Sequence, residues 1–115
     1  MPQPKLPRIR GTQIGLHSPG QIDQIKDDML AGRFAFEEQR AQVAGVRDRN
    51  RTYYVKVGHH RVVAAMEIYR QKRDASFILE LIRLGKWDNV DHPPNDSRPL
   101  PARNWWGSLR NKLNV

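Results

Sequence analysis

Four consecutive residues near the middle of the chain, Gly58-His59-His60-Arg61, have side chains suited to phosphate chemistry. An imidazole can take or give a proton near neutral pH, and a guanidinium can hold a phosphate through paired hydrogen bonds. Apolar residues recur at helical spacing from Val62 onward, so this run stands where a helix begins. The N–H groups and the dipole of a helix N-terminus favour an anion at the same place. We therefore predict that the three side chains converge on a phosphate, after a sharp turn at Gly58.

The two imidazoles cannot both have the same role. His59 and His60 can each act as a general acid or base, while Arg61 can hold a phosphate or stabilise charge in a transition state. Adjacent residues at a helix start point in different directions, so one imidazole is expected to line the site while the other packs or orients it. The alternative is that the run binds phosphate and catalyses nothing, because short motifs often match by chance.

Arginines outside this run could extend the grip on a phosphate backbone. Arg47, Arg49 and Arg51 lie within five residues, in a charged turn that is either solvated or wraps a phosphate. Arg98 lies in a loop with four prolines, residues 91–103, which could fold over the helix start. These residues are therefore candidate nucleic-acid contacts.

Two further groups could reach the same site. His17 and Gln21 stand at the start of an earlier expected helix and could face the histidines, although a solvated loop histidine is the simpler interpretation of His17. Glu67 and Asp91 are carboxylates that could support His59 or hold Mg²⁺ or another divalent ion. The sequence contains no recognised metal-binding spacing and no cysteine.

The elements that must position these residues follow from hydrophobic periodicity and from Gly and Pro breaks. A strand is expected over 53–57, where apolar and polar residues alternate, and another over 39–46. Helices are expected from Ser18, with Gln21 completing a capping box, to Gly32; from the histidines to Arg73; and from Ser76 to Gly85. A short helix is expected over 104–113. These elements predict an α+β fold, a small mixed sheet with packed helices, extended by a C-terminal loop and short helix.

The 115 residues are enough for one domain with a modest core. We divide the chain into a basic N-terminal arm, 1–11, and a single domain, 12–115, with its core at about 12–90 and an extension at 91–115. Leu6 and Ile9 could attach the arm as an edge strand, or the arm could be a disordered junction. We expect no membrane span and no secretory signal, because no long apolar run is present.

The net charge of +8 predicts a polyanionic partner, either nucleic acid or an acidic protein. Solubility alone is the plainer explanation, but it seldom requires so large an excess of one sign.

The run Gly58-His59-His60-Arg61, followed by Ala64-Ala65, resembles the GHHR or GERR box of the ParB/sulfiredoxin-like superfamily, which also follows a strand and opens a helix. The similarity covers about residues 10 to 70. The tail, with Trp87-Asp88, 97–99 and 104–107, resembles the C-terminal toxin modules of bacterial polymorphic toxins, including RHS-repeat proteins. The resemblance therefore implies a ParB/sulfiredoxin-like fold.

For function, the resemblance implies an antibacterial nuclease toxin, a DNase, in which His60 and Arg61 contact phosphate. His59 stands where the superfamily varies with activity, so it is the first candidate for chemistry. The alternatives are an ATP- or CTP-binding enzyme or switch, or a DNA-binding module without catalysis. Val57 replaces an Asp found in many relatives, and the absence of cysteine excludes sulfiredoxin reductase chemistry.

A toxin of this kind implies delivery as part of a larger secreted effector and action in the target-cell cytoplasm during competition between bacteria. It also implies a cognate immunity protein. We expect that protein to be acidic and to cover the box, because it must compete with a polyanion.

Overall fold

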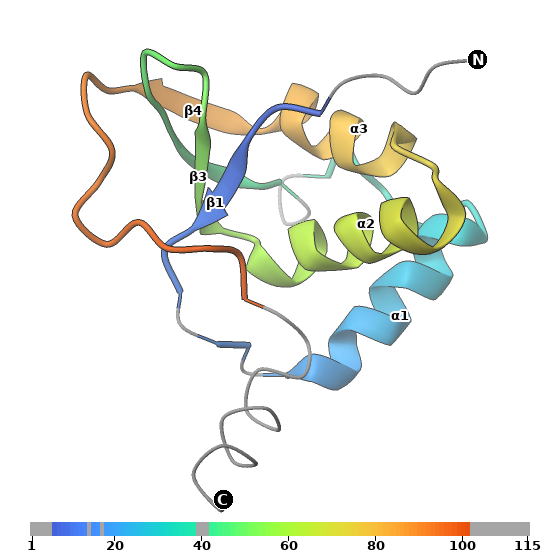
Figure 1. The fold of residues 1–115 in the computed structure, drawn as a ribbon. Coiled ribbons are helices and arrows are strands. Elements are labelled where there is room, and N and C mark those ends of the chain that lie inside the picture. Colours follow the sequence, from blue (N-terminus) through green and yellow to red (C-terminus); the bar gives the residue numbers. More distant parts are fainter. Residues whose placement is uncertain (1–5, 14, 17, 39–41, 102–115) are drawn as a thin grey trace, which may run out of the picture.

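The structure is a computed structural model that describes residues 6–13, 15–16, 18–38 and 42–101. Within these residues, four strands form one mixed sheet and three helices lie on one side of it, an α+β arrangement (Figure 1). The fold class predicted from the sequence is confirmed. The elements follow one another as β1 (Ile9–Gly11), α1 (Pro19–Leu30), β2 (Ala44–Arg47), β3 (Tyr53–Val57), α2 (His59–Lys72), α3 (Ser76–Leu84) and β4 (Lys86–Asn89).

The sheet has the order β1-β3-β2-β4. β3 pairs with β2 in antiparallel register, while β1 is parallel to β3 and β4 is parallel to β2. The part of the N-terminal arm from Ile9 to Gly11 is therefore an edge strand, one of the two outcomes expected for it. Because β3 lies next to β1 and leads directly into α2, the sheet fixes where Gly58 and the histidines stand.

Two strand predictions differ from the structure. The expected strand over 39–46 is β2, Ala44–Arg47, with residues 39–41 outside the described part. Ala44 faces Val57, the last residue of β3, so β3 offers no further residues for a longer partner. β4 was missed because Lys86–Asn89 has only one large apolar side chain, Trp87, which packs edge-on against Tyr53 with ring centroids 4.9 Å apart.

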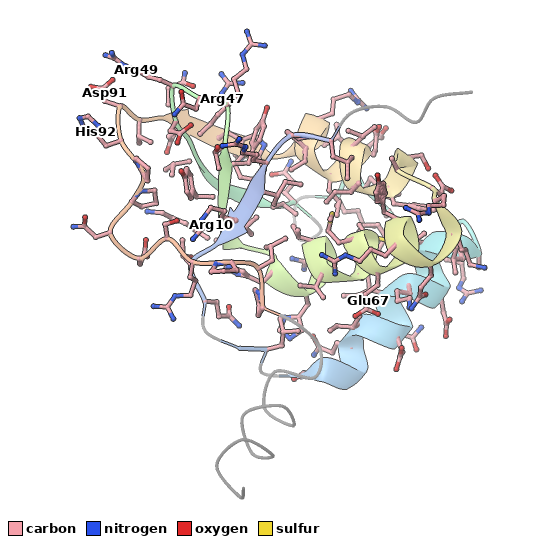
Figure 2. All side chains as sticks on the ribbon, in the orientation of Figure 1. Arg10, Arg47, Arg49, Glu67, Asp91 and His92 are labelled. Atoms are coloured by element: carbon pink, nitrogen blue, oxygen red, sulfur yellow. The ribbon has the colours of Figure 1, made fainter. Side chains whose placement is uncertain are left out.

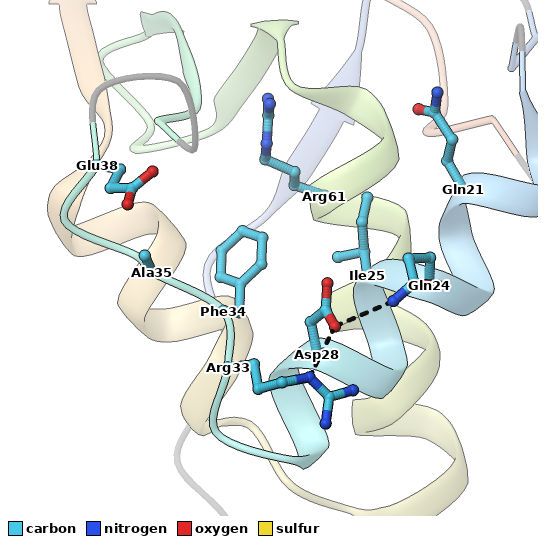
Figure 3. A pocket seen from close by; sticks show the side chains of 9 residues that line it. All are labelled: Gln21, Gln24, Ile25, Asp28, Arg33, Phe34, Ala35, Glu38 and Arg61. Carbon is cyan, nitrogen blue, oxygen red and sulfur yellow. Dashed lines mark hydrogen bonds and ion pairs between the residues drawn. The ribbon is translucent and has the colours of Figure 1, made fainter.

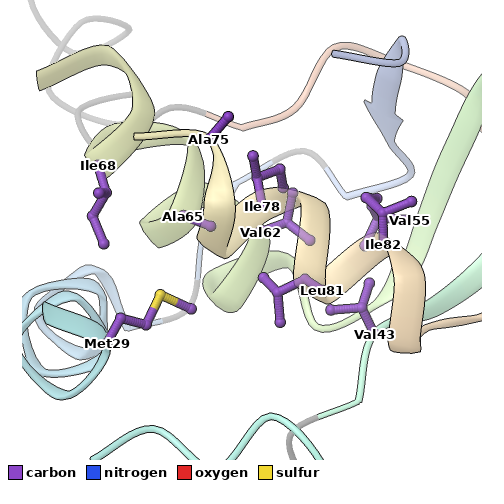
Figure 4. Close-up of a cluster of buried hydrophobic side chains, with 10 residues drawn as sticks. All are labelled: Met29, Val43, Val55, Val62, Ala65, Ile68, Ala75, Ile78, Leu81 and Ile82. Atoms are coloured by element: carbon purple, nitrogen blue, oxygen red, sulfur yellow. The ribbon is translucent and has the colours of Figure 1, made fainter. Parts of the chain in front are cut away.

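The main core lies between the sheet and the helices α2 and α3, and α1 packs on the far side of α2 (Figures 1 and 4). A smaller cluster joins the start of α1 to α2 through Leu16, Ile22, Val63 and Ala64. The first turns of α1 and α2 are therefore held close together. The residues at the centre of the main core are Met29, Val43, Val55, Val62, Ala65, Ile68, Ala75, Ile78, Leu81 and Ile82.

The start of α1 differs from the expected capping box. Ser18 makes no side-chain cap, and the Gln21 N–H donates to the Ser18 carbonyl at 2.9 Å instead. The prediction is wrong because Gln21 lines a pocket, while the Ser18 N–H donates to the His60 Nε2 atom. The end of α1 agrees with the sequence: Gly32 has φ +75° just beyond Leu30.

The charged turn between β2 and β3 is a hairpin turn, as predicted. Its buried Asp48 carboxylate accepts the N–H groups of Asn50 and Thr52 and the Tyr54 hydroxyl at 2.7–3.0 Å. The bond from Thr52, followed by the one from Tyr54, lowers the pKa of Asp48. The turn is therefore fixed from within by its acidic residue, which leaves the arginines on its surface.

The chain beyond β4 returns across the sheet edge as an irregular segment, residues 91–101, which we call the strap (Figure 1, orange to red). Gly11 and Arg98 exchange two backbone hydrogen bonds of 2.8 and 3.0 Å, and the Arg10 Nε donates to the Ser97 hydroxyl. The expected loop does fold toward the start of α2. The helix expected over 104–113 falls outside the described residues.

None of the helices in the described part of the chain is both long enough and apolar enough to span a bilayer.

Candidate phosphate site at the start of helix α2

A glycine turn leads from β3 into α2. Gly58 has φ +92°, a left-handed conformation that residues with a Cβ adopt at a cost. Its carbonyl accepts the Val62 N–H at 3.1 Å, and no side chain caps the first turn of the helix. The sharp turn predicted at Gly58 is thus confirmed.

The first residue of the helix, His59, is buried, with 3% of its surface exposed. Its Nε2 accepts the Thr12 N–H at 3.1 Å, and the Thr12 hydroxyl donates to the Val55 carbonyl at 2.9 Å. Burial lowers the pKa of His59 and the nearby charge of His60 lowers it further, while a hydrogen bond with the Val55 backbone raises it. The ring is therefore neutral near pH 7, and a backbone N–H occupies its Nε2.

His60 points toward the other side of the helix and is only partly buried. Its Nε2 accepts the Ser18 N–H at 3.2 Å, which ties the start of α2 to the residue before α1. The structure thus places His59 against β1 and His60 against α1.

Arg61 extends into a pocket between α1 and the segment that follows it (Figure 3). The pocket has a volume of about 440 Å³. The guanidinium is partly buried, and desolvation lowers its pKa. It forms no hydrogen bond or ion pair with any residue that the structure describes. The residues around it are Gln21, Gln24, Ile25, Asp28, Arg33, Phe34, Ala35 and Glu38.

The three side chains therefore do not converge, contrary to the prediction. Successive residues of an α-helix are rotated by about 100° around its axis. His59, His60 and Arg61 consequently leave one turn toward β1, toward the start of α1 and toward the pocket. The structure brings Arg61 together with Gln21, a second candidate, and separates both from His59. His17 falls outside the described residues.

The arginines of the charged turn lie at the other end of β3 from Gly58. Arg47 donates to the Asn89 side chain at 2.9 Å, and Arg49 pairs with Asp91 at 3.0 Å; Arg51 is exposed (Figure 2). Arg98 stands apart from them on the strap beside β1. The turn arginines therefore form a surface separate from Arg61.

The candidate carboxylates lie far apart. Glu67 pairs with Lys26 at 3.1 Å between α2 and α1, whereas Asp91 pairs with Arg49 at the opposite side of the molecule (Figure 2). Neither is placed to support His59. In the described part of the chain, no three acidic or histidine side chains gather as a metal site would require.

Several pocket residues were not identified from the sequence. Gln24 and Asp28 follow the candidate Gln21 at helical spacing along α1 and line the pocket with it. Arg33 donates to Asp28, and the Phe34 ring forms one wall. Gln21 and Gln24 are exposed, so the helical periodicity alone gave no signal that separated them from an ordinary solvated face.

Comparison with known proteins yields no relative: no family model matches the chain, and no curated protein or solved structure matches it. The resemblance to the ParB/sulfiredoxin-like superfamily therefore stays a prediction.

Proposed function

We propose that this chain is a nuclease domain of the ParB/sulfiredoxin type, the toxin module of a larger antibacterial effector, and that Arg61 binds a phosphate of its nucleic-acid substrate. The observation that carries the proposal is the partly buried guanidinium of Arg61, which has no partner among the described residues and faces a pocket.

Partial burial of the Arg61 guanidinium carries a desolvation cost that an anion in the pocket would offset. A charge that is moved out of water loses free energy unless an opposite charge or hydrogen bonds compensate it. Among the described residues, the partly buried cations Arg10, Lys26 and Arg47 each bond to another side chain, and Lys26 contacts both Glu67 and Gln71. A phosphate in the pocket would give Arg61 the two acceptors that its planar geometry favours.

The chemistry assigned to the two histidines changes with their positions. His60 is only partly buried and precedes Arg61 in the chain, so it replaces the buried His59 as the candidate for proton transfer. It must first release the Ser18 N–H. His59 is buried and holds structure, so in this proposal it supports the turn and does not react. Glu67 and Asp91 do not fit a shared metal site, and the proposal contains no metal-bound step.

The partners follow from charge. A chain of +8 attracts nucleic acid by a sequence-independent electrostatic term, and DNA is the favoured substrate. The exposed Arg51 and the neighbouring turn arginines would add backbone contacts outside the pocket. A cognate immunity protein would be acidic, because it must displace the same polyanion.

The pocket itself favours one alternative, an ATP- or CTP-binding enzyme or switch. Its volume of about 440 Å³ lies within the range of small-molecule sites. A phenyl ring, two side-chain amides and a guanidinium could bind a base and its phosphate together. A non-catalytic DNA-binding module would use the charged surface without the pocket.

The experiment compares the purified chain with two matched arginine variants. Wild-type protein and the variants Arg61→Gln and Arg70→Gln are incubated with plasmid DNA and with RNA, with magnesium and with a chelator. Arg70 is exposed near the end of the same helix, so its variant controls for lost charge. We expect Arg61→Gln to reduce cleavage by about 100-fold or more, the scale of losing a group that stabilises a transition state. Arg70→Gln should stay within about threefold of wild type, since one exposed charge changes only the general attraction to the backbone.

Thermal-shift measurements with ATP, CTP and inorganic phosphate separate the alternatives. Stabilisation by a nucleotide without any cleavage would favour the nucleotide-binding protein. DNA binding without either effect would favour the simple binding module. Cleavage that survives Arg61→Gln unchanged would reject Arg61 as the phosphate contact.

A further inference from the structure

His59 lies where three separate parts of the chain meet. Its ring stands at the start of α2, Thr12 just after β1 donates to it, and Val55 of β3 bonds to it through its backbone. The same edge of the ring, its Nε2 and Cδ2 atoms, lies close to Gly11, and Pro101 of the strap lies beside Gly11. A Cβ placed on Gly11 would come within 3.2 Å of His59 Nε2 and 3.4 Å of the Pro101 ring. β1 and the strap thus close over the imidazole.

The bonds at the ring fix one protonation state. Nε2 accepts a hydrogen bond, so in this arrangement it carries no proton, and the ring proton lies on Nδ1. Adding a second proton would place an N–H opposite the Thr12 N–H. Two donors repel each other, so the charged ring and the closed arrangement are incompatible.

Few hydrogen bonds hold the strap at this place, and Leu100 also packs against the main core. Two backbone bonds between Gly11 and Arg98, one bond from Arg10 to Ser97, and the buried Pro101 attach it to β1. The Nε of Arg98 is buried there without a hydrogen-bond partner in the described part of the chain. A buried unpaired donor costs free energy, which weakens the closed state. A change at His59 can therefore shift the balance toward opening.

We propose that His59 is a latch: in its neutral form it holds β1 and the strap against the start of α2, and its protonation releases both. The latch does not depend on the nuclease proposal, because it concerns how the two segments are held. Its opening would uncover the imidazole beside the Gly58 turn.

The ionisable groups around the latch favour the neutral ring at pH 7. Those carried by the packed elements near it are Arg10 on β1, Tyr54 and Lys56 on β3, His60 and Arg61 on α2, and Arg98 on the strap. Five of these are bases, and Tyr54 donates to Asp48. Burial together with His60 lowers the pKa of His59 below its usual value. The pKa of His59 is lower in the closed arrangement than after β1 and the strap have moved away, so the open arrangement binds a proton more readily. Opening therefore becomes easier as the pH falls below about 6.5.

Amide hydrogen exchange followed by NMR tests the latch in the whole chain. Protection factors, which remove the intrinsic effect of pH on exchange, are compared from pH 7.5 to 4.5. For Gly11, Thr12 and Arg98 we expect a fall of roughly tenfold per pH unit below about pH 6.5, because each opening takes up one proton. Core amides such as that of Ile68 should keep their protection over the range in which the latch opens.

Two variants distinguish a latch from general acid sensitivity. His59→Gln keeps an acceptor near the position of Nε2 but cannot be protonated, so the fall should disappear. His92→Gln, on the exposed part of the strap, should retain it. Unchanged protection of Thr12 in wild type down to pH 4.5 would overturn the latch, as would an equal fall in His59→Gln. If that variant does not fold, the imidazole nitrogen shifts of wild type decide: protonated Nε2 at pH 7 would contradict the arrangement.

Discussion

His59 and Arg61 lie on two sides of the start of α2, and their side-chain nitrogen atoms differ in hydrogen bonding. On the β1 side, the His59 ring is buried, accepts the Thr12 N–H and lies close to Gly11, which has Pro101 beside it. On the α1 side, Arg61 faces a pocket of about 440 Å³ and has no partner among the described residues. The imidazole on the first side is hydrogen-bonded within the protein, while the guanidinium on the second side has no hydrogen-bond partner among the described residues.

The difference shows that a short motif identifies residue types but not their directions. Gly58 and the following helix place three basic side chains on one turn, and the rotation of about 100° per residue then separates them. Which side becomes structural depends on what packs there, here β1 and the strap. Chemistry is therefore better sought on the side whose polar groups remain unsatisfied.

The largest effect that separates the two sides is expected from His59→Ala. The change leaves a cavity and deprives the Thr12 N–H of its acceptor, so the free energy of unfolding should fall by about 2–4 kcal/mol. Urea denaturation measures the loss. The control is His92→Ala on the exposed strap, which should change stability by less than about 0.5 kcal/mol. Equal, small losses in both variants would mean that the His59 side is not the structural one.

A smaller effect is expected from Gly11→Ala, which tests how tightly β1 lies over the imidazole. The new Cβ would meet His59 at 3.2 Å, so the imidazole must move by a few tenths of an ångström, while Pro101 at 3.4 Å limits the room for the change. We expect the free energy of unfolding to fall by about 1 kcal/mol, because the cost of crowding in the folded state exceeds the gain from a less flexible unfolded chain. Chemical denaturation again provides the measurement.

Gly20 gives a matched control for that change. A Cβ on Gly20, in the first turn of α1, would meet no atom within 4 Å. Gly20→Ala should therefore stabilise the protein by about 0.4–1 kcal/mol. If Gly11→Ala stabilised it equally, the close contact among β1, the strap and His59 would be refuted.

The sequence predicted the fold correctly where the local pattern of residues agrees with how the elements pack. Alternation over 53–57 gave β3 with its observed bounds, and Gly58 marked the turn before α2. β4 could not be predicted from the sequence, because a short strand with one large apolar residue is defined by its pairing with β2 and not by its own pattern. Long-range pairing of this kind leaves little trace in local sequence.

For the site, the sequence predicted the types of residue but not their arrangement in space. Arg61 and Gln21 were both singled out, and the structure places them in one pocket. Convergence of His59 with Arg61 failed because the contact between His59 and Thr12 spans 47 residues and follows from the pairing of β1 with β3. The Gln21 half of the capping box failed for a similar reason, since His60, 42 residues away, accepts the Ser18 N–H that the Gln21 side chain would otherwise bind.

The smallest effect on stability is expected from Arg61→Met, and it tests the unsatisfied side directly. Removing an unpaired, partly buried charge while keeping most of the side-chain volume should change the free energy of unfolding by no more than about 0.5 kcal/mol, or increase it. Lys26→Met is the contrasting variant, because Lys26 bonds to Glu67 and Gln71 and its loss removes both hydrogen bonds. The free energy of unfolding of Lys26→Met should fall by about 1 kcal/mol or more.

Phosphate completes the test of Arg61. Raising inorganic phosphate at constant ionic strength should increase the melting temperature of wild type and of Lys26→Met, because binding to the folded state alone stabilises it. The same titration should leave Arg61→Met unchanged. A large loss of stability in Arg61→Met without phosphate would show that the guanidinium already has a partner, and the two sides of the helix start would then no longer differ.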